Sequence, residues 1–560
     1  MARAAISRWA LAVLGVLTVQ TAAGTASGQV LRTWGGEEGS HEVGATHAAV
    51  GVVTSAPPVP AGPGPTVPVA PAGGASPSPP KEATGALPPL EDPENNEAIV
   101  RAGGRVGLRY VLEGVEVRGN TSTLTRVVLR YVPFKVGAPL DADDAELTLT
   151  RFRLLGTGFF RDVQLSLRRG SRRGNAILVV TVTERNTIVV NDFWLGLATD
   201  ASPSGVTRPL TAYGGLDVSE TNLAGTGVTV GGAVAVAEDQ VALRTRFADP
   251  QFLKTRWTLE GELLYNNAQD FFGNGSVLVY NPKGSSAQDY AVADYQRFGG
   301  SFGAGHDLGV STRFTLDYRL EHISSQLPLA ASDHRGDSIE PINFLLIQGS
   351  SYLSTLRGTL VYDTRDEPFL PTRGDKVSML GEISLAPFGS DYPYFKLQVH
   401  ASHWLTLPWG HVLELDAFAG AIFGTAPLFE NYYVGDFSDL LPDRVLGLNF
   451  DRRSAPNFFG TDIGEIVRGQ YAGKLNVSYR MPVYHGKRSI YGIDLFTSAG
   501  VYGIANQQDF TNPAPGYNGA SLVPIDLTFN LGVQIETSAG GFTFGLSNFL
   551  GFIPQYGGGR

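Results

Sequence analysis

Alternation between apolar and polar residues dominates the last two thirds of the chain and restricts its fold more than any other feature. Over residues 186–554, runs of about ten residues repeat with a period of two. Successive strand residues point to opposite faces, so each run predicts a strand with one apolar and one polar face. In one run Phe314, Leu316, Tyr318 and Leu320 alternate with Arg313, Thr315, Asp317, Arg319 and Glu321.

A lipid-facing apolar wall around a polar lumen explains why so many runs follow the same rule. Lipid tolerates only helices or closed barrels, because it offers the backbone no hydrogen bonds. About 370 residues at roughly 23 per strand and loop give about 16 strands. We therefore expect a mainly β chain, with a transmembrane antiparallel β-barrel over residues 186–560. A soluble β-helix or sandwich accounts less well for the aromatic residues near the ends of the runs.

The N-terminus has the features of an export signal. Arg3 and Arg8 form a basic region before an apolar run over residues 9–19, which is too short to span a bilayer as a helix. Small residues follow, as in a cleavable signal peptide, which we predict over residues 1–28. Residues 29–105 form a predicted disordered tether, because residues 54–93 hold 13 of the 34 prolines. We interpret it as a spacer, in preference to a ligand for an envelope partner.

Composition excludes several classes of protein. The chain has no cysteine, which excludes disulfide scaffolds, cysteine-ligated metals and thiol nucleophiles. A net charge of −10 argues against a nucleic-acid partner. The sequence also has no evident catalytic Ser/His/Asp arrangement or dinucleotide fingerprint. We therefore expect no enzyme activity, no cofactor and no metal site.

A small α/β domain is predicted over residues 106–185. Its signals run strand, helix, helix, strand, strand, over residues 110–118, 123–131, 141–155, 160–168 and 176–184. Thr121 or Ser122 is the predicted cap of the first helix. The acidic start of the second helix suits the helix dipole and needs no metal.

This segment resembles a POTRA domain. The matching residues are Gly119, Asn120, Thr121, Gly137, Leu155–Gly158, Phe159, Phe160, Asp162, Val163, Val182 and Glu184. The resemblance implies a docking module that binds extended peptides by adding a strand to a sheet edge.

The barrel resembles those of the BamA/TamA superfamily of outer-membrane assembly proteins. Residues 363–374 (DTRDEPFLPTRG) are similar to a strand-turn signature of that family. We expect Asp363, Arg365 and Asp366 to end a strand and pair locally, and Pro371 and Gly374 to shape the turn that follows.

Residues 427–436 resemble the segment that enters the family's long sixth loop, which folds back into the lumen. The resemblance implies a loop arginine, usually in Val-Arg-Gly followed by an aromatic residue. Arg468-Gly469 matches by letter, although Gln470 precedes Tyr471. Arg444, with Gly447 nearby, lies closer to the expected place, and both candidates remain open.

A lumenal arginine needs a carboxylate partner to offset its loss of hydration. The positions of the usual partners in the family are occupied here by Ser478 and Ser498. Asp494 and Glu536 are the candidate substitutes, because we expect both to point inward.

The resemblance implies an outer-membrane factor whose POTRA domain lies in the periplasm and receives unfolded outer-membrane or secreted clients. Insertion or export would proceed at the seam between a first strand near residues 187–197 and a last strand near residues 542–552. Its expected partners are the lipid bilayer, the clients, and periplasmic chaperones or lipoproteins. A passive pore or dedicated two-partner secretion channel is the first alternative. A surface adhesion or structural barrel, using Arg335-Gly336-Asp337 and residues 435–469, is the second.

Overall fold

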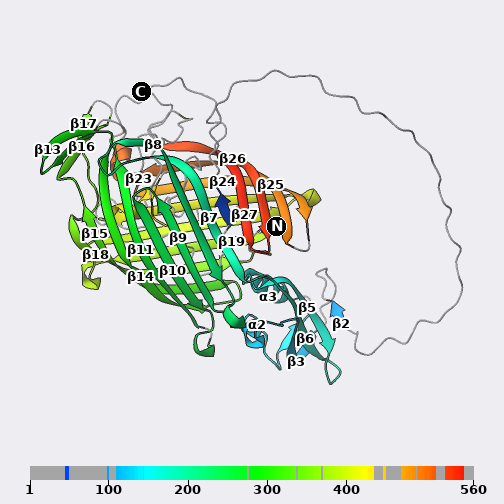
Figure 1. Cartoon of the computed structure of the whole chain (residues 1–560). Coiled ribbons are helices and arrows are strands. Elements are labelled where there is room, and N and C mark those ends of the chain that lie inside the picture. The colour runs from blue at the N-terminus through cyan, green and yellow to red at the C-terminus, as the bar shows by residue number, and fades with distance from the viewer. Residues whose placement is uncertain are drawn as a thin grey trace, which may run out of the picture.

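The computed structural model describes residues 109–547, together with two short segments, 45–48 and 97–99. Gaps in this description fall at residues 143, 256, 274–276, 336–337, 368–369, 434–445, 449–458, 460–467, 487–488 and 512–523. Figure 1 shows a barrel with a small α/β domain at one of its ends. We call this the near end of the barrel, and the opposite end the far end.

The barrel is one sheet of 16 strands, of which the first in chain order, β1 (Ala45–Ala48), is parallel to its neighbour. The other fifteen run antiparallel, each paired with the next along the chain. They are β7 (Ile188–Ala201), β8 (Thr207–Glu220), β9 (Thr229–Ala237), β10 (Gln240–Asp249), β11 (Trp257–Phe272), β14 (Ala291–Asp307), β15 (Thr312–Gln326), β18 (Gly349–Asp363), β19 (Gly374–Ser384), β20 (Tyr394–Thr406), β21 (Val412–Gly424), β24 (Tyr471–His485), β25 (Ile490–Ala505), β26 (Ile525–Thr537) and β27 (Gly540–Ser547).

The predicted alternation sets the two faces of the wall. On β15, Leu316 is 45% exposed, whereas Asp317 and Arg319 are each 4% exposed. The apolar side chains therefore face outward, where lipid replaces water, and the charged ones face the lumen. The mainly β fold with a barrel is confirmed. The part of the predicted last strand beyond Ser547 lies outside the described residues.

Shorter elements complete the barrel domain. A four-stranded sheet stands at the far end, formed by the β11–β14 and β15–β18 connections. Its strands are β12 (Val277–Asn281), β13 (Gly284–Gln288), β16 (Ala330–Arg335) and β17 (Ser338–Pro341). The short helices are η2 (Leu223–Gly225), η3 (Phe252–Lys254), η4 (Ala386–Phe388), η5 (Pro408–Gly410), η6 (Leu428–Glu430) and α5 (Gln507–Thr511). Among the described residues no helix is both long and apolar enough to cross a membrane.

The α/β domain has the predicted order of elements. Its members are β3 (Arg109–Arg118), α2 (Thr125–Arg130), β4 (Pro139–Asp141), α3 (Ala145–Gly156), β5 (Phe160–Arg169) and β6 (Asn175–Glu184). The sheet order is β2-β5-β6-β3-β4, where β2 is Glu97–Ile99. The two helices cover one face of this sheet through a core that includes Val127, Val128, Leu154 and Phe159.

The predicted cap of the first helix is wrong. Its N-cap residue is Leu124, which makes no side-chain hydrogen bond to the helix. Glu184, at the end of β6, instead accepts hydrogen bonds from the backbone N–H groups of Thr121, Ser122 and Thr123, at 2.5–3.1 Å. Burial alone would raise the pKa of Glu184, but the hydrogen bonds from these residues outweigh it and hold the pKa at about 2.

The domain covers the near end of the barrel through contacts with several of its turns. Asp307, the last residue of β14, accepts from Arg130 at 3.1 Å and from Arg153 at 2.5 Å, both on the domain's helices. Arg313 on β15 contacts the same carboxylate at 3.0 Å. Elsewhere on the rim, Leu124 N donates to Gly225 O, and Arg185 Nη2 donates to Thr537 O at 3.2 Å. One buried carboxylate thus joins two domain arginines to the barrel.

Replacing Glu184 by glutamine should loosen the loop at residues 119–124. The amide cannot match a carboxylate that accepts several N–H groups, so we expect a loss of about 1–2 kcal/mol, reduced by partial exposure. Hydrogen–deuterium exchange of the full-length protein should show faster exchange there. Because the folded pKa lies below the usual 4.5, this stabilisation is complete above pH 4.5 and is lost as the pH falls towards 2. Glu113→Gln, at the other end of the same sheet, is the matched control.

Replacing Asp307 by asparagine should release the α/β domain from the barrel. Three arginines would lose their shared carboxylate, and breaking a buried ion pair costs about 3–5 kcal/mol. We expect faster hydrogen–deuterium exchange in α2 while the barrel keeps its heat-modifiable migration. Asp375→Asn, at the near end of β19, should leave α2 unchanged, because its carboxylate contacts His403 of β20. Equal protection of α2 in the two variants would contradict this role for Asp307.

Candidate functional site in the barrel lumen

The connection between β21 and β24 turns inward and fills part of the lumen. It begins with η6, whose three residues Leu428, Phe429 and Glu430 are all at most 3% exposed. It continues into β22 (Tyr432–Tyr433), which pairs with β23 (Arg468–Gly469). Gly420 on β21 makes room for this path, since a Cβ there would collide with the Tyr432 ring. Among the fifteen antiparallel strands, this connection joins the eleventh to the twelfth and is the sixth at the far end.

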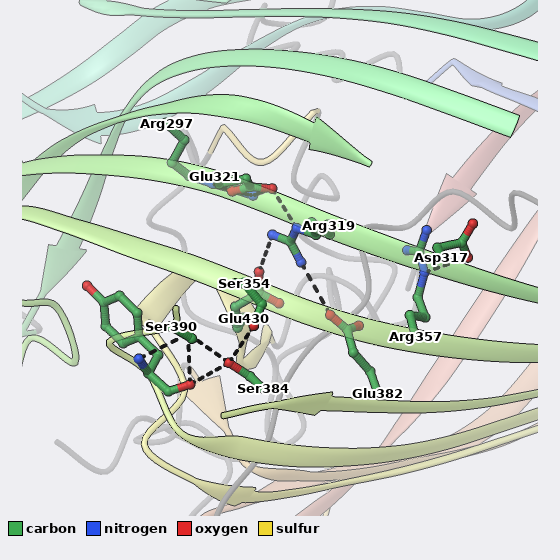
Figure 2. Close-up of polar contacts among 11 residues, drawn as sticks. Arg297, Asp317, Arg319, Glu321, Ser354, Arg357, Glu382, Ser384, Ser390 and Glu430 are labelled. Atoms are coloured by element: carbon green, nitrogen blue, oxygen red, sulfur yellow. Dashed lines mark hydrogen bonds and ion pairs between the residues drawn. The ribbon is translucent and has the colours of Figure 1, made fainter. Parts of the chain in front are cut away.

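Charged side chains from five neighbouring strands, β14, β15, β18, β19 and β20, meet this loop inside the barrel (Figure 2). The cluster contains four cations and four carboxylates: Arg297, Arg319, Arg357, Lys396, Asp317, Glu321, Glu382 and Glu430. All eight are buried, and only Glu430 comes from the loop. Equal numbers of opposite charges are the condition under which ions remain stable away from water.

Three of these cations hold the loop directly. Arg319 donates to Glu430 at 2.6 Å and to Glu321 at 2.6 Å. Arg297, which also bonds Glu321, lies with its guanidinium carbon 3.8 Å from the centre of the Phe429 ring. The Lys396 ammonium lies 5.6 Å from the Tyr432 ring centre. Ion-pair and cation–π contacts therefore fix Phe429, Glu430 and Tyr432 of the loop to β14, β15 and β20.

Apolar packing closes the lumen above this cluster. Loop residues Tyr433, Leu446 and Leu448 belong to one buried core with residues of the wall and of the far-end sheet. The other members include Val277, Val279, Ala331, Phe344, Tyr502 and Ile504. The far end is thus packed, while the α/β domain covers the near end.

The structure places Arg468 in this loop but pairs it with a different carboxylate from those predicted. Its Nη2 atom donates to Asp270, at the far end of β11. Its guanidinium also lies 4.9 Å from the ring centre of Phe272. Gly469 packs against Ile504 and Ala505, where a Cβ would collide.

Asp494 and Glu536 lie at the near end and cannot reach Arg468. Asp494 is eleven residues before Ala505 on β25, which amounts to about 37 Å of strand. Asp494 contacts Arg480 at 3.6 Å, and Glu536 contacts Arg185 at 3.5 Å. The predicted pairing of these carboxylates with Arg468 is therefore wrong. The alternation predicts that Asp494 and Glu536 face inward, but it does not predict their positions along the strands.

Both carboxylates line a cavity of about 380 Å³ between the α/β domain and the barrel turns. Glu367 lines it too, and burial together with the neighbouring Glu536 raises the pKa of Glu367 to about 8. Arg151, Arg161 and Arg185 contribute positive charge from the domain side. At neutral pH a protonated Glu367 adds no repulsion to this junction.

The second loop candidate is partly described. Gly447 has a positive φ of 80°, next to Leu446 at 50°, so the chain makes a tight turn inside the lumen. Asn266 on β11 donates to Leu446 O at 2.8 Å and holds this turn. Arg444 lies outside the described residues.

The strand-turn signature forms a local network. Arg365 donates to Asp363 at 2.7 Å, and Asp366 accepts from Thr372 N at 2.9 Å. Gly374 has a φ of 112° close to Thr364 O, which excludes a side chain there. Pro371 O accepts from the lumenal Arg480. These residues shape one near-end turn.

Sequence reasoning missed the residues that hold the loop. Arg319 and Glu321 were recognised as polar-face residues, but Glu430, Glu382 and Lys396 were not singled out. The sequence does contain a signal for them, because successive inward positions on β15 are charged. Buried charges need partners of opposite sign from elsewhere in the lumen. In the described part of the chain no group of three or more histidine or acidic side chains is placed to hold a metal ion.

Comparison with known proteins adds domain matches and distant structural likenesses. BamA from Haemophilus ducreyi lacking POTRA domains 1–3 is similar at 15% identity, with a TM-score of 0.42, over 78% of this chain and 80% of that one. CdiB from Escherichia coli is similar at 12% identity, with a TM-score of 0.49, over 79% and 73%. CdiB from Acinetobacter baumannii is similar at 11% identity, with a TM-score of 0.42, over 76% and 67%.

The domain matches agree with the two parts of the fold. A model described as POTRA, a surface antigen variable number repeat, matches residues 110–185. A model of the Omp85 superfamily domain matches residues 222–440, which run from the turn preceding β9 into the lumenal loop. The chain therefore carries a POTRA domain followed by a barrel with an Omp85 superfamily domain.

Proposed function

We propose that this protein is an outer-membrane assembly or translocation factor. Its POTRA domain, in the periplasm, receives unfolded clients, and its barrel inserts or exports them. The Omp85 superfamily domain supports an outer-membrane insertion or translocation role. The similar structures are those of BamA and CdiB. The proposal includes both secretion of one substrate and insertion of many.

The seam between β7 and β27 is the observation that carries the proposal. Among the described residues these two strands share no continuous ladder. In the described part of the chain, near-end bonds run to the turn before β27, where Val190 N donates to Ala539 O at 2.8 Å and Asn186 Nδ2 donates to Ser538 O at 3.1 Å. Unpaired backbone groups within lipid are costly, and the described part of β27 pairs at this edge with the four-residue strand β1, so the edge favours pairing with an incoming strand.

The lumenal loop sets the second requirement of the mechanism. In the described state the loop and the POTRA domain obstruct opposite ends of the barrel. Passage of a client through the lumen therefore requires release of the loop from Arg297 and Arg319 and movement of the POTRA domain away from Asp307. Insertion at the seam requires neither step to be complete. Free energy would come from client folding, since the function needs no nucleotide.

Client folding tests the proposal. The purified protein is reconstituted in liposomes, an unfolded outer-membrane protein is added, and protease-protected product is timed. We expect several-fold faster folding than in empty liposomes, and loss of the effect when residues 106–185 are deleted. Heat-modifiable migration of the deletion variant shows that its barrel is folded. Unchanged folding rates with steady ion conductance would favour the dedicated channel.

Glu430→Gln should weaken the hold on the lumenal loop. The variant removes the loop's carboxylate and leaves Arg319 with excess buried charge, at a cost of about 3–5 kcal/mol. We expect more frequent open-channel events in planar bilayers and faster trypsin cleavage between residues 434 and 467. Glu238→Gln, an exposed glutamate in the β9–β10 turn, is the control. Identical conductance in the two variants would exclude Glu430 as a loop anchor.

A further inference from the structure

Two strand edges of this protein are each covered by a short strand from the segment that precedes the POTRA domain. Residues 97–99 form β2, which pairs antiparallel with β5 of the POTRA sheet, with Ala98 opposite Leu167. Residues 45–48 form β1, which pairs parallel with β27, with Thr46 opposite Phe542. Strand β1 also contacts β7, so it lies within the seam.

The two covered edges are those that would otherwise be open to pairing with another chain. β5 is the outermost strand of the POTRA fold once β2 is set aside, and β27 faces the open side of the barrel sheet. An exposed edge presents unpaired N–H and C=O groups that recruit other extended chains. The residues that cover them come from the same N-terminal segment, separated by 48 residues.

Both covering strands are built to be weak. They have three and four residues, and the four-residue strand uses parallel pairing, which is less stable per residue. Between them lie the 13 prolines of residues 54–93, which lack the N–H group needed for a ladder. Proline-rich sequence of this kind is poorly suited to form a strand.

We propose that residues 45–48 and 97–99 are built-in caps, which cover the strand-accepting edges of the barrel seam and the POTRA sheet until an extended client segment displaces them. This inference rests on the proposed function for the identity of the displacing partner. The occupancy of the edges by the chain itself does not depend on it.

The short link between β2 and β3 gives the POTRA cap an advantage. Nine residues of sequence, 100–108, separate β2 from β3. Such a link produces an effective concentration in the millimolar range. A free extended peptide competes against it, so we expect removal of the cap to tighten peptide binding by about three- to tenfold.

Engineered disulfides test the caps in the full-length protein, which has no cysteine of its own. The pairs Ala98→Cys with Leu167→Cys and Thr46→Cys with Phe542→Cys should cross-link on mild oxidation in liposomes. Two pairs displaced along the same strands, Ala98→Cys with Gln164→Cys and Thr46→Cys with Ser547→Cys, should not, because about 10 Å or more separates their positions. Failure of either matched pair to exceed its displaced control would overturn the corresponding cap.

Peptide binding tests whether a cap competes with a client. The probe is a fluorescein-labelled peptide of about ten alternating apolar and polar residues, a length typical of a barrel strand, measured by anisotropy against the full-length protein. Ala98→Pro, which places a proline in the middle of the three-residue strand β2, should lower the Kd about three- to tenfold. The oxidised form of the double variant Ala98→Cys, Leu167→Cys should raise the Kd until reductant is added. Equal Kd values for all forms would overturn displacement. Peptide anisotropy does not depend on client folding. A failure of the client-folding assay can therefore be told apart from a failure of cap displacement.

Discussion

Hydrogen bonding of the backbone in lipid is the constraint on which this structure depends. It requires a closed sheet, and the sheet in turn sends alternate side chains into a lumen that must hold them. Inward positions such as Asp317, Arg319 and Glu321 are charged, so they need partners of opposite sign in the same space. The loop between β21 and β24 supplies one of them through Glu430. Wall and loop therefore stabilise each other electrostatically.

Three closures follow from this arrangement, and they differ in strength. Buried ion pairs hold the lumenal loop and the POTRA domain, with Arg319 and Asp307 at their centres. The seam has only a few direct backbone bonds at its near end, together with a four-residue strand. The weakest closure thus lies where a client strand would enter the membrane. The stronger ones hold the lumenal loop and the POTRA domain at the barrel.

Much of the fold could be predicted from the sequence because alternation is a local property. Leu316 outward and Arg319 inward follow from the period alone. Partners across the lumen could not be predicted in this way, because they depend on height along each strand and on the path of a loop. Asp494 was assigned the correct face but the wrong end of β25. The loop before α2 is held by Glu184, which lies 61 residues further along the chain than Thr123.

The β14–β15 hairpin has a mechanical consequence. Its near-end residues Asp307 and Arg313 lie at the junction with the POTRA helices, and its inward residues Arg297 and Arg319 hold Phe429 and Glu430 of the loop. A load that tilts the POTRA domain is therefore borne by the same pair of strands that retains the lumenal loop. The hairpin thus couples the POTRA domain, which is attached at its near end, to the lumenal loop, which is held further along its strands.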